Sequence, residues 1–227
     1  MTKHQRVREK ISACNRLDKF LNSALAVALR HLARFVYPNE WAALRANAAK
    51  LAIATRLDPK FERLQPIFDA LVMAEDRRFY SHAGVDLRAI FRAILILMLS
   101  QQLQGGSTIT QQLVRTLTQD YARTVKRKYK EVLLAALLDE EINKVDQIRS
   151  YLAIAYFGWR MNGIHQALRR QGFSPPLSTI QAAQIIARLK YPEPRVATPS
   201  TKERIERRAA HIAELIYTFQ KNENEQT

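Results

Sequence analysis

The chain has 227 residues, of which 47% are hydrophobic, so it is long enough for one large domain with a buried core. Its one cysteine, Cys14, excludes an intramolecular disulfide framework and any zinc site built from several cysteines. The net charge, 36 − 21 = +15, indicates an acidic partner, and both nucleic acid and anionic lipid or lipid pyrophosphate satisfy it.

Residues 1–44 form a basic N-terminal segment. Apolar residues recur at helical spacing from Leu17 to Val36, which predicts an amphipathic helix. Its apolar run, Phe20–Leu29, has ten residues, whereas a transmembrane span needs roughly 20. Because Asp18 precedes this run closely, we expect no cleaved signal peptide. We expect no membrane anchor either, and instead a helix that packs on the domain or lies on a membrane surface.

The rest of the chain is predicted to be helical. In chain order, apolar periodicity and turn residues predict helices over Trp41–Leu57, Leu64–Phe79, Leu87–Gln102, Tyr121–Asn143, Asp146–Phe157, Gly163–Arg170, Ser178–Leu189 and the basic Lys202–Lys221. A further helix starts at the Ser107-Thr108 pair. No convincing strand alternation or internal repeat occurs, so we expect an all-α fold divided into residues 1–44, 45–200 and 201–227.

The stretch Ala74–Leu117 opens with the acid pair Glu75 and Asp76, and a second acid, Glu131, follows on another predicted helix. Two carboxylates that face one cleft suit glycosyl chemistry, since one handles a proton while the other orients or stabilises. The alternative is that each acid is a surface group paired with one of the 36 basic residues. A nearby basic cluster is a solvated face unless it lines the same cleft. Its members are Arg123, Arg127, Lys128 and Lys130.

A glycine pair ends the predicted helix Leu87–Gln102 and leads into Ser107 and Thr108. Free N–H groups at a helix start, together with hydroxyl groups, favour a phosphate, although an ordinary capped helix break is the alternative. The loop lacks the lysine of a P-loop. The preceding helix is apolar all round over Ala93–Leu99, so it is either fully buried or faces lipid.

Four blocks carry a family resemblance. Residues 75–86 fit the pattern Glu-Asp-x-x-Phe-x-x-His-x-Gly-x-Asp, and residues 105–112 fit Gly-x-Ser-Thr-Ile-Thr-Gln-Gln. Residues 127–131 fit Arg-Lys-x-x-Glu, and residues 151–164 form a weaker fourth block. In this order and spacing they resemble the peptidoglycan glycosyltransferases, namely the transglycosylase domain of class A penicillin-binding proteins and the monofunctional transglycosylases (glycosyltransferase family 51). The resemblance covers residues 45–200.

The resemblance implies a lysozyme-like helical lobe with a small apolar lobe, the jaw, that contacts the membrane. The segment Ile90–Leu99 falls where that apolar surface would be. The implied reaction transfers a glycan from a lipid-pyrophosphate donor to the 4-hydroxyl of lipid II, with inversion. The implied partners are lipid II, lipid-linked glycan, the membrane surface and other cell-wall synthesis proteins, but no nucleic acid. The implied location is the outer, periplasmic face of the bacterial cytoplasmic membrane, as a peripheral protein.

The resemblance also implies roles for individual residues. Glu75 would be the general base that deprotonates the acceptor hydroxyl, and Glu131 the second catalytic acid, which orients cations or a metal. Arg115, Arg123 and Lys130 would hold the donor pyrophosphate. The implied substrate-binding residues are Asp76, Phe79, His82, Ser107, Thr108, Gln112, Arg115, Arg123, Arg127, Lys128 and Lys130. No cofactor follows from the motifs, but a divalent cation, Mg or Mn, is compatible with the donor pyrophosphate.

The chain departs from the family pattern in three places. Ala153 replaces the asparagine of the fourth block, Gln171 lies near the replaced aromatic pair, and an N-terminal anchor is absent or reduced. These departures concern acceptor geometry, processivity and export, and they leave an alternative in which a non-catalytic relative binds lipid II or nascent glycan as an accessory protein. A basic nucleic-acid binder lacks any recognisable reading motif. A lysozyme-like hydrolase would not use the blocks that serve a pyrophosphate donor.

Overall fold

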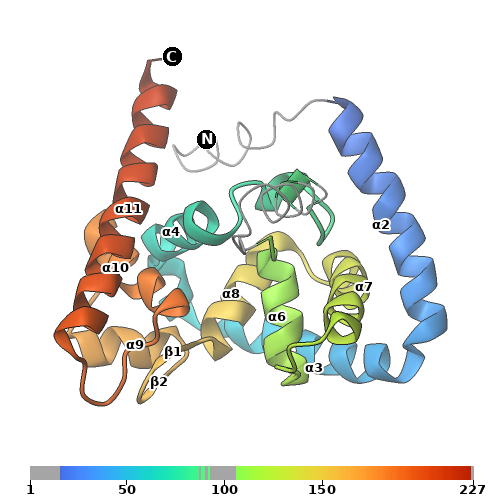
Figure 1. Ribbon diagram of the computed structural model, residues 1–227, viewed down its shortest axis with the longest axis horizontal. Coiled ribbons are helices and arrows are strands. Elements are labelled where there is room, and N and C mark those ends of the chain that lie inside the picture. Colours follow the sequence, from blue (N-terminus) through green and yellow to red (C-terminus); the bar gives the residue numbers. More distant parts are fainter. Residues whose placement is uncertain (1–15, 87, 90–91, 93–105, 226–227) are drawn as a thin grey trace. The chain divides into compact units, whose positions relative to one another are not determined.

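The computed structural model describes residues 16–86, 88–89, 92 and 106–225. These residues are mostly helical, with one small two-stranded sheet, which confirms the expected all-α, lysozyme-like class (Figure 1). The predicted helix Leu87–Gln102, with the apolar segment Ile90–Leu99, lies largely outside the described residues. The chain divides into two compact units, one within Met1–Ile53 and Arg78–Gln147 and the other within Ala54–Arg77 and Ile148–Thr227.

The first unit is built on α7 (Val125–Glu141), which packs against α2 (Arg16–Val36) and α6 (Ile109–Thr118) (Figure 1). The leucines of α7, such as Leu133 and Leu137, are fully buried and drive this packing, because burying a leucine side chain contributes about 1.5–3 kcal/mol. Polar contacts add to it at the helix surface, where Arg30 Nε donates to the Ala136 carbonyl at 3.1 Å. The unit also contains the short 3-10 helix η2 (Phe79–Ser81) and much of α3 (Pro38–Leu57).

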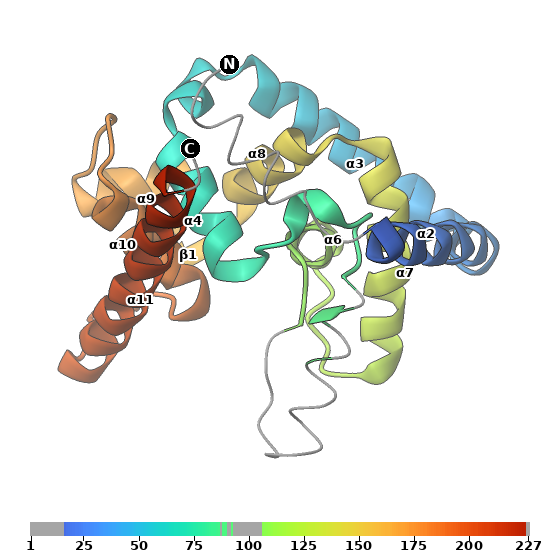
Figure 2. The same ribbon diagram turned by 90° about the horizontal axis from the view of Figure 1, so that it is seen from above.

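The second unit packs α4 (Gln65–Glu75) and α11 (Pro199–Asn224) against α10 (Thr179–Lys190), as Figure 2 shows. The 3-10 helix η1 (Pro59–Arg63), α9 (Ile164–Gln171) and the strands β1 (Tyr156–Gly158) and β2 (Met161–Asn162) complete it. A capping box fixes the start of α10, since Ser178 accepts from the Gln181 N–H and Gln181 reaches back to the Ser178 backbone. The C-terminal helix is part of this core, because α11 buries Ile205, Ile212 and other apolar residues of one face.

Several helix ends differ from the sequence-based boundaries. The predicted helix Tyr121–Asn143 begins only at Val125, because the Thr124 side chain caps it by accepting from the Arg127 N–H. The prediction that a helix extends to Phe157 was wrong. Helix α8 (Lys144–Ile154) stops earlier, and Phe157 belongs to β1, which pairs with β2 in an antiparallel hairpin. A strand of three residues is too short to show a period-two pattern.

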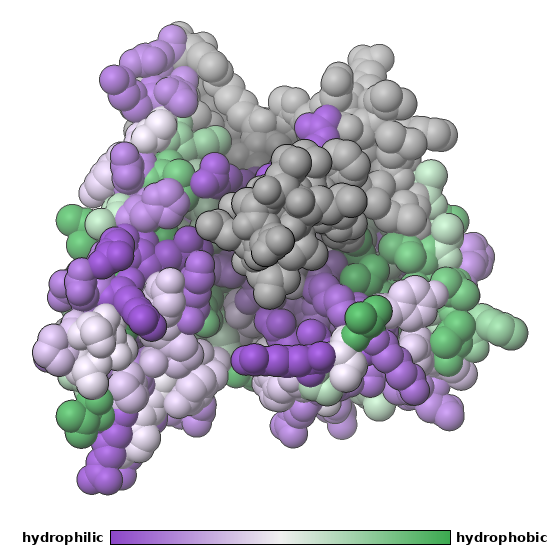
Figure 3. Space-filling model, viewed as in Figure 1, coloured by the Kyte–Doolittle hydropathy of each residue, from purple (hydrophilic) through white to green (hydrophobic). Residues whose placement is uncertain are grey.

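Hydrophobic side chains gather on the surface over α2 (Figure 3). Val27, Leu32, Phe35 and Val36 are all exposed, and Phe35 reaches 86% exposure. Among the residues that the structure describes, no helix is both long and apolar enough to cross a membrane. The exposed face of α2 fits the predicted amphipathic character of this helix.

Candidate functional site

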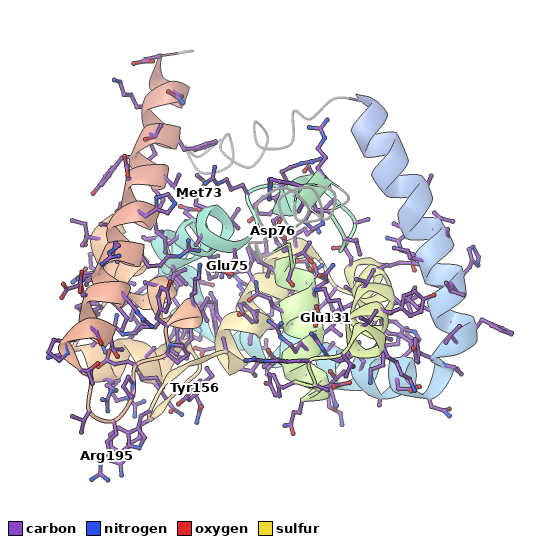
Figure 4. The ribbon with its side chains drawn as sticks, viewed as in Figure 1. Met73, Glu75, Asp76, Glu131, Tyr156 and Arg195 are labelled. Carbon is purple, nitrogen blue, oxygen red and sulfur yellow. The ribbon has the colours of Figure 1, made fainter. Side chains whose placement is uncertain are left out.

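Glu131 is the buried centre of a charged cluster in the first unit. It lies on the side of α7 that faces α6 and is 3% exposed (Figure 4). Lys128 Nζ donates to Glu131 Oε1 at 2.6 Å, and Arg127 Nη1 donates to Oε2. A buried carboxylate needs such partners, because an unpaired buried charge costs several kcal/mol. With both oxygens held by cations, Glu131 is placed to orient Arg127 and Lys128.

Lys128 connects Glu131 to the start of α6. Its ammonium group also donates to Ser107 Oγ at 2.8 Å and to Gln111 Oε1 at 2.7 Å, so its three donors are used. Burial lowers the pKa of Lys128 because it disfavours the charged form, while the hydrogen bond to Glu131 opposes this shift. Within the described part of the chain, the Nε2 donor of the buried Gln111 has no hydrogen-bond partner.

Other predicted cations converge on the same interface between α6 and α7. A small cavity of about 10 Å³ is lined by Val114, Arg115, Thr118, Asp120, Arg127, Lys130, Glu131 and Leu134. Lys130 Nζ binds Asp120 Oδ2 at 2.7 Å, and this hydrogen bond lowers the pKa of the Asp120 carboxyl group. Arg123 is different, since it is exposed and makes no ion pair with any residue that the structure describes. The structure therefore groups Arg115, Arg127, Lys128, Lys130 and Glu131.

Two motif residues, Gly84 and Thr108, have a structural role at the start of α6. Thr108 is the N-cap, accepting from the Gln111 N–H at 3.1 Å and donating its own hydroxyl hydrogen to the Gly84 carbonyl at 2.7 Å. Gly84 has φ +80°, and a Cβ there would lie 2.4 Å from the Ala135 oxygen of α7. The Thr108 hydroxyl thus fastens α6 to the glycine turn, and its predicted contact with substrate stays a prediction.

Phe79 and His82 are buried in the same unit. Lys144 Nζ lies 4.5 Å from the Phe79 ring centre, donates to the His82 carbonyl at 2.8 Å and pairs with Asp139 at 2.5 Å. The Phe79 and His82 rings lie edge to face, 6.2 Å apart. These contacts hold the turn after the acid pair. Gln112, also buried, lies on α6 near its start. The predicted substrate contacts of Phe79, His82 and Gln112 stay predictions.

The other predicted acid, Glu75, belongs to the second unit. It ends α4, and Asp76 is the C-cap and is buried (Figure 4). Arg208 of α11 donates through Nη2 to the Ala74 carbonyl at 2.9 Å and to Glu75 Oε1 at 3.3 Å. Arg208 is a residue that sequence reasoning missed, as is Gln111. Gln111 lies inside a recognised motif, whereas Arg208 is one of many basic residues in its helix and carries no local signal.

The residues that the structure describes do not form a metal site of their own. In the described ranges, no group of three or more His, Cys, Asp or Glu side chains is arranged to hold a metal ion. Glu131, the acid expected to orient a metal, already has both oxygens engaged by Arg127 and Lys128.

Comparison with known proteins completes the description. Residues 47–216 match the transglycosylase family. Penicillin-binding protein 1B of Haemophilus influenzae is 38% identical over 113 residues, which cover 49% of this chain and 14% of that protein. Penicillin-binding protein 1A of Escherichia coli is 39% identical over 114 residues, covering 49% of this chain and 13% of that protein. A monofunctional glycosyltransferase of Staphylococcus aureus is 40% identical over 89 residues, covering 39% of this chain and 33% of that protein. The family match covers most of the chain, and the protein therefore belongs to the transglycosylase family.

Proposed function

We propose that this protein is a peptidoglycan glycosyltransferase that polymerises lipid II into glycan strands. The family match and the similarity to a monofunctional glycosyltransferase support this reaction class. The observation that carries the proposal is the half-buried cluster in which Lys128 joins Glu131 to Ser107 and Gln111. A set of cations fixed by a buried carboxylate, next to a capped helix start, suits a pyrophosphate-bearing donor.

In the proposed reaction, the 4-hydroxyl oxygen of lipid II attacks the anomeric carbon of the donor glycan. The bond from that carbon to the lipid pyrophosphate breaks, and the configuration inverts. Glu75 takes the hydroxyl proton as general base. Arg208, through its contact with Glu75 Oε1, is a positioning residue for this carboxylate.

The leaving pyrophosphate gains negative charge as the bond breaks. Arg115, Arg123 and Lys130 hold this charge in the proposal, and charge-assisted hydrogen bonds to a developing anion lower the barrier. Glu131 keeps Arg127 and Lys128 in place near Arg115 and Lys130. The remaining proposed substrate contacts come from Asp76, Phe79, His82, Ser107, Thr108 and Gln112. A divalent cation, Mg or Mn, would bind through the pyrophosphate itself.

The proposed location is the outer face of the cytoplasmic membrane, where lipid II and lipid-linked glycan are the partners and other cell-wall synthesis proteins join them. The net charge of +15 favours an anionic lipid surface, at about 1 kcal/mol for each basic residue near it. The exposed apolar side chains of α2 add a face that suits peripheral contact with lipid.

One observation favours a second candidate, a non-catalytic relative that binds lipid II or nascent glycan. Ala153 stands in the fourth block, where the family pattern has an asparagine, so one amide is missing from that block. The accessory protein and the enzyme both bind lipid II, and they differ in whether polymer forms.

The test is glycan-chain formation from labelled lipid II in liposomes, together with lipid II binding, for the wild type and Glu75→Gln. We expect polymer from the wild type and a loss of at least about a hundredfold in rate for Glu75→Gln, because general-base catalysis contributes about 10²–10⁴-fold. Lipid II binding should persist in the variant. Glu62→Gln, at an exposed position of η1, is the matched control and should polymerise like the wild type.

Each outcome separates the candidates. Polymerisation by Glu75→Gln at the wild-type rate would remove Glu75 from its role as base. Absence of polymer from the wild type, with lipid II bound, would support the accessory protein.

A further inference from the structure

The second unit carries a basic pocket apart from every residue assigned above. A hollow of about 310 Å³ is lined by Trp159, Arg160, Gln166, Arg169 and Arg170. The guanidinium carbons of Arg160, Arg170 and Arg195 lie 4.5, 4.8 and 5.5 Å from the centre of the Trp159 ring. Guanidinium groups at this distance are attracted to the indole. We call these six residues the Trp159 pocket.

Backbone pairing holds the pocket's segments together. The Trp159 N–H donates to the Glu193 carbonyl at 2.8 Å, and the Glu193 N–H donates to the Phe157 carbonyl at 3.1 Å. Gly158 allows this approach, because its φ is +139° and a Cβ there would lie 2.3 Å from the Glu193 oxygen. The β1–β2 turn, which carries Trp159 and Arg160, is thereby fixed against the segment that leads to Arg195, labelled in Figure 4. The segments that carry Trp159, Arg160 and Arg195 are therefore joined by backbone hydrogen bonds.

Carboxylates do not neutralise the pocket. Glu193 is its acidic neighbour, and Glu193 Oε1 lies 4.0 Å from Arg170 Nη2. The other oxygen, Oε2, accepts from Arg188 Nε at 2.7 Å and from Gln171 Nε2 at 3.1 Å, so Arg188 already balances this charge. Across residues 16–86 and 106–225, neither Arg160 nor Arg169 makes an ion pair, and Arg195 makes none either.

The Trp159 pocket therefore holds several like charges without a matching anion. Arg160, Arg170 and Arg195 bring three like charges to the same indole ring, and a bound anion would relieve their mutual repulsion. The Nε donor of Arg170 is also buried with no hydrogen-bond partner in the described part of the chain. An anion with several acceptor oxygens would satisfy both the charge and the unused donors of these guanidinium groups.

We propose that the Trp159 pocket binds a phosphate-class oxyanion, either a soluble diphosphate or the phosphate ester of a lipid headgroup. Arginine forks match phosphate oxygens two at a time, which favours phosphate over a halide. A volume of about 310 Å³ lies at the lower end of the roughly 300–1,000 Å³ that small-molecule sites occupy, so it suits a compact headgroup. The site is independent of the chemistry proposed for Glu75.

The chain provides its own fluorescent reporter for this site. It has two tryptophans, Trp41 and Trp159, so the Trp41→Phe variant leaves Trp159 as the only indole. We expect the full-length variant to show a saturable change in Trp159 fluorescence on titration with sodium pyrophosphate at constant ionic strength. Adding Arg160→Asn and Arg169→Gln should weaken the apparent affinity at least tenfold. Asparagine tolerates the left-handed φ of +55° at position 160, and Arg169 is exposed, so both changes preserve the fold.

Two controls separate the pocket from general charge and from the proposed donor site. Arg204→Gln removes an exposed positive charge from α11 and should leave the affinity within twofold of the parent. Arg115→Ala with Lys130→Ala alters the proposed donor site, and the Trp159 response should survive it even if polymerisation is lost.

A second experiment distinguishes a soluble diphosphate from a lipid headgroup as the ligand. It measures cosedimentation of the protein with vesicles of phosphatidylglycerol or of phosphatidylcholine. A saturable response to pyrophosphate supports a soluble anion. A response to phosphatidylglycerol vesicles alone, reduced by Arg160→Asn with Arg169→Gln, supports a lipid headgroup. No response in either experiment, or an equal loss with Arg204→Gln, would overturn the proposal.

Discussion

At the scale of single residues, Lys128 shows how burial and pairing oppose each other. Desolvation lowers its pKa, Arg115 and Arg127 lower it further, and Glu131 raises it. Because the folded-state pKa lies below the unfolded value of 10.5, burial of the ammonium group reduces stability at lower pH. This destabilisation disappears as the pH rises from the folded-state pKa of Lys128 to 10.5. Over that pH range Lys128 therefore makes the free energy of unfolding increase with pH.

We predict that Glu131→Gln lowers the pKa of Lys128 beyond its value in the wild type. The substitution removes the charge that favours the ammonium form and leaves the neighbouring guanidinium groups in place. An NMR titration of the lysine side chains measures this directly. Glu140→Gln, at an exposed acid of the same helix that pairs with Arg34, is the control and should leave the Lys128 pKa unchanged. An unchanged or higher pKa in Glu131→Gln would mean that Glu131 does not hold the charge of Lys128.

At the scale of elements, the N-terminus of α6 is fixed by one side chain with two tasks. The Thr108 hydroxyl caps the helix and also donates to the Gly84 carbonyl, 24 residues earlier in the chain. The N-cap of α11, Thr198, accepts from the Thr201 N–H at 3.2 Å, and its other hydrogen bonds are to nearby side chains. The two threonines allow a comparison of local capping with capping that also joins distant segments.

We expect Thr108→Ala to reduce the free energy of unfolding by about 2–4 kcal/mol, since a lost cap costs about 1 kcal/mol and an unsatisfied buried carbonyl adds about 1–3. Thr198→Ala should cost only about 1 kcal/mol, because its cap is exposed and local. Thr108→Ser keeps the hydroxyl and should retain most of the stability. Denaturation in urea, followed by circular dichroism, measures all three. Equal losses at positions 108 and 198 would show that the bond to Gly84 contributes nothing.

At the scale of the whole molecule, the net charge of +15 dominates the expected behaviour toward surfaces. Charge of this size attracts anionic lipid over a distance set by the Debye length, which is about 10 Å at 0.1 M salt and about 3 Å at 1 M. Apolar contact through α2 would respond to salt much less. The balance between these two contributions would decide how the protein binds an anionic lipid surface.

We predict that binding to phosphatidylglycerol vesicles falls at least tenfold between 0.05 M and 0.5 M sodium chloride, concentrations chosen so that screening shortens the Debye length severalfold. Flotation assays measure the bound fraction, and phosphatidylcholine vesicles show how much binding needs no anionic lipid. Binding that stays constant across this range would indicate that apolar contacts, and not charge, hold the protein to lipid.

The sequence by itself determined the all-α class, most of the helices and the family. Helices are encoded by apolar residues three and four positions apart and by caps such as Ser178 with Gln181, and both signals are local. The motif residues Gly84 and Thr108 were recognisable as a pattern before their contact was known. Local sequence patterns did not predict the exact ends of each helix, as the early end of α8 and the short β1 strand show.

Only the tertiary structure decided which distant side chains meet. Arg208 reaches Glu75 across 133 residues of chain, and Arg195 reaches the Trp159 ring through the pairing of Gly158 with Glu193. In a chain with 36 basic residues, no local pattern distinguishes these arginines from those that face water. Their partners are set by the packing of α11 on α4 and by the backbone approach at Gly158, which depend on many long-range contacts at once. Such contacts have no fixed spacing in the sequence, and therefore the fold alone assigns them.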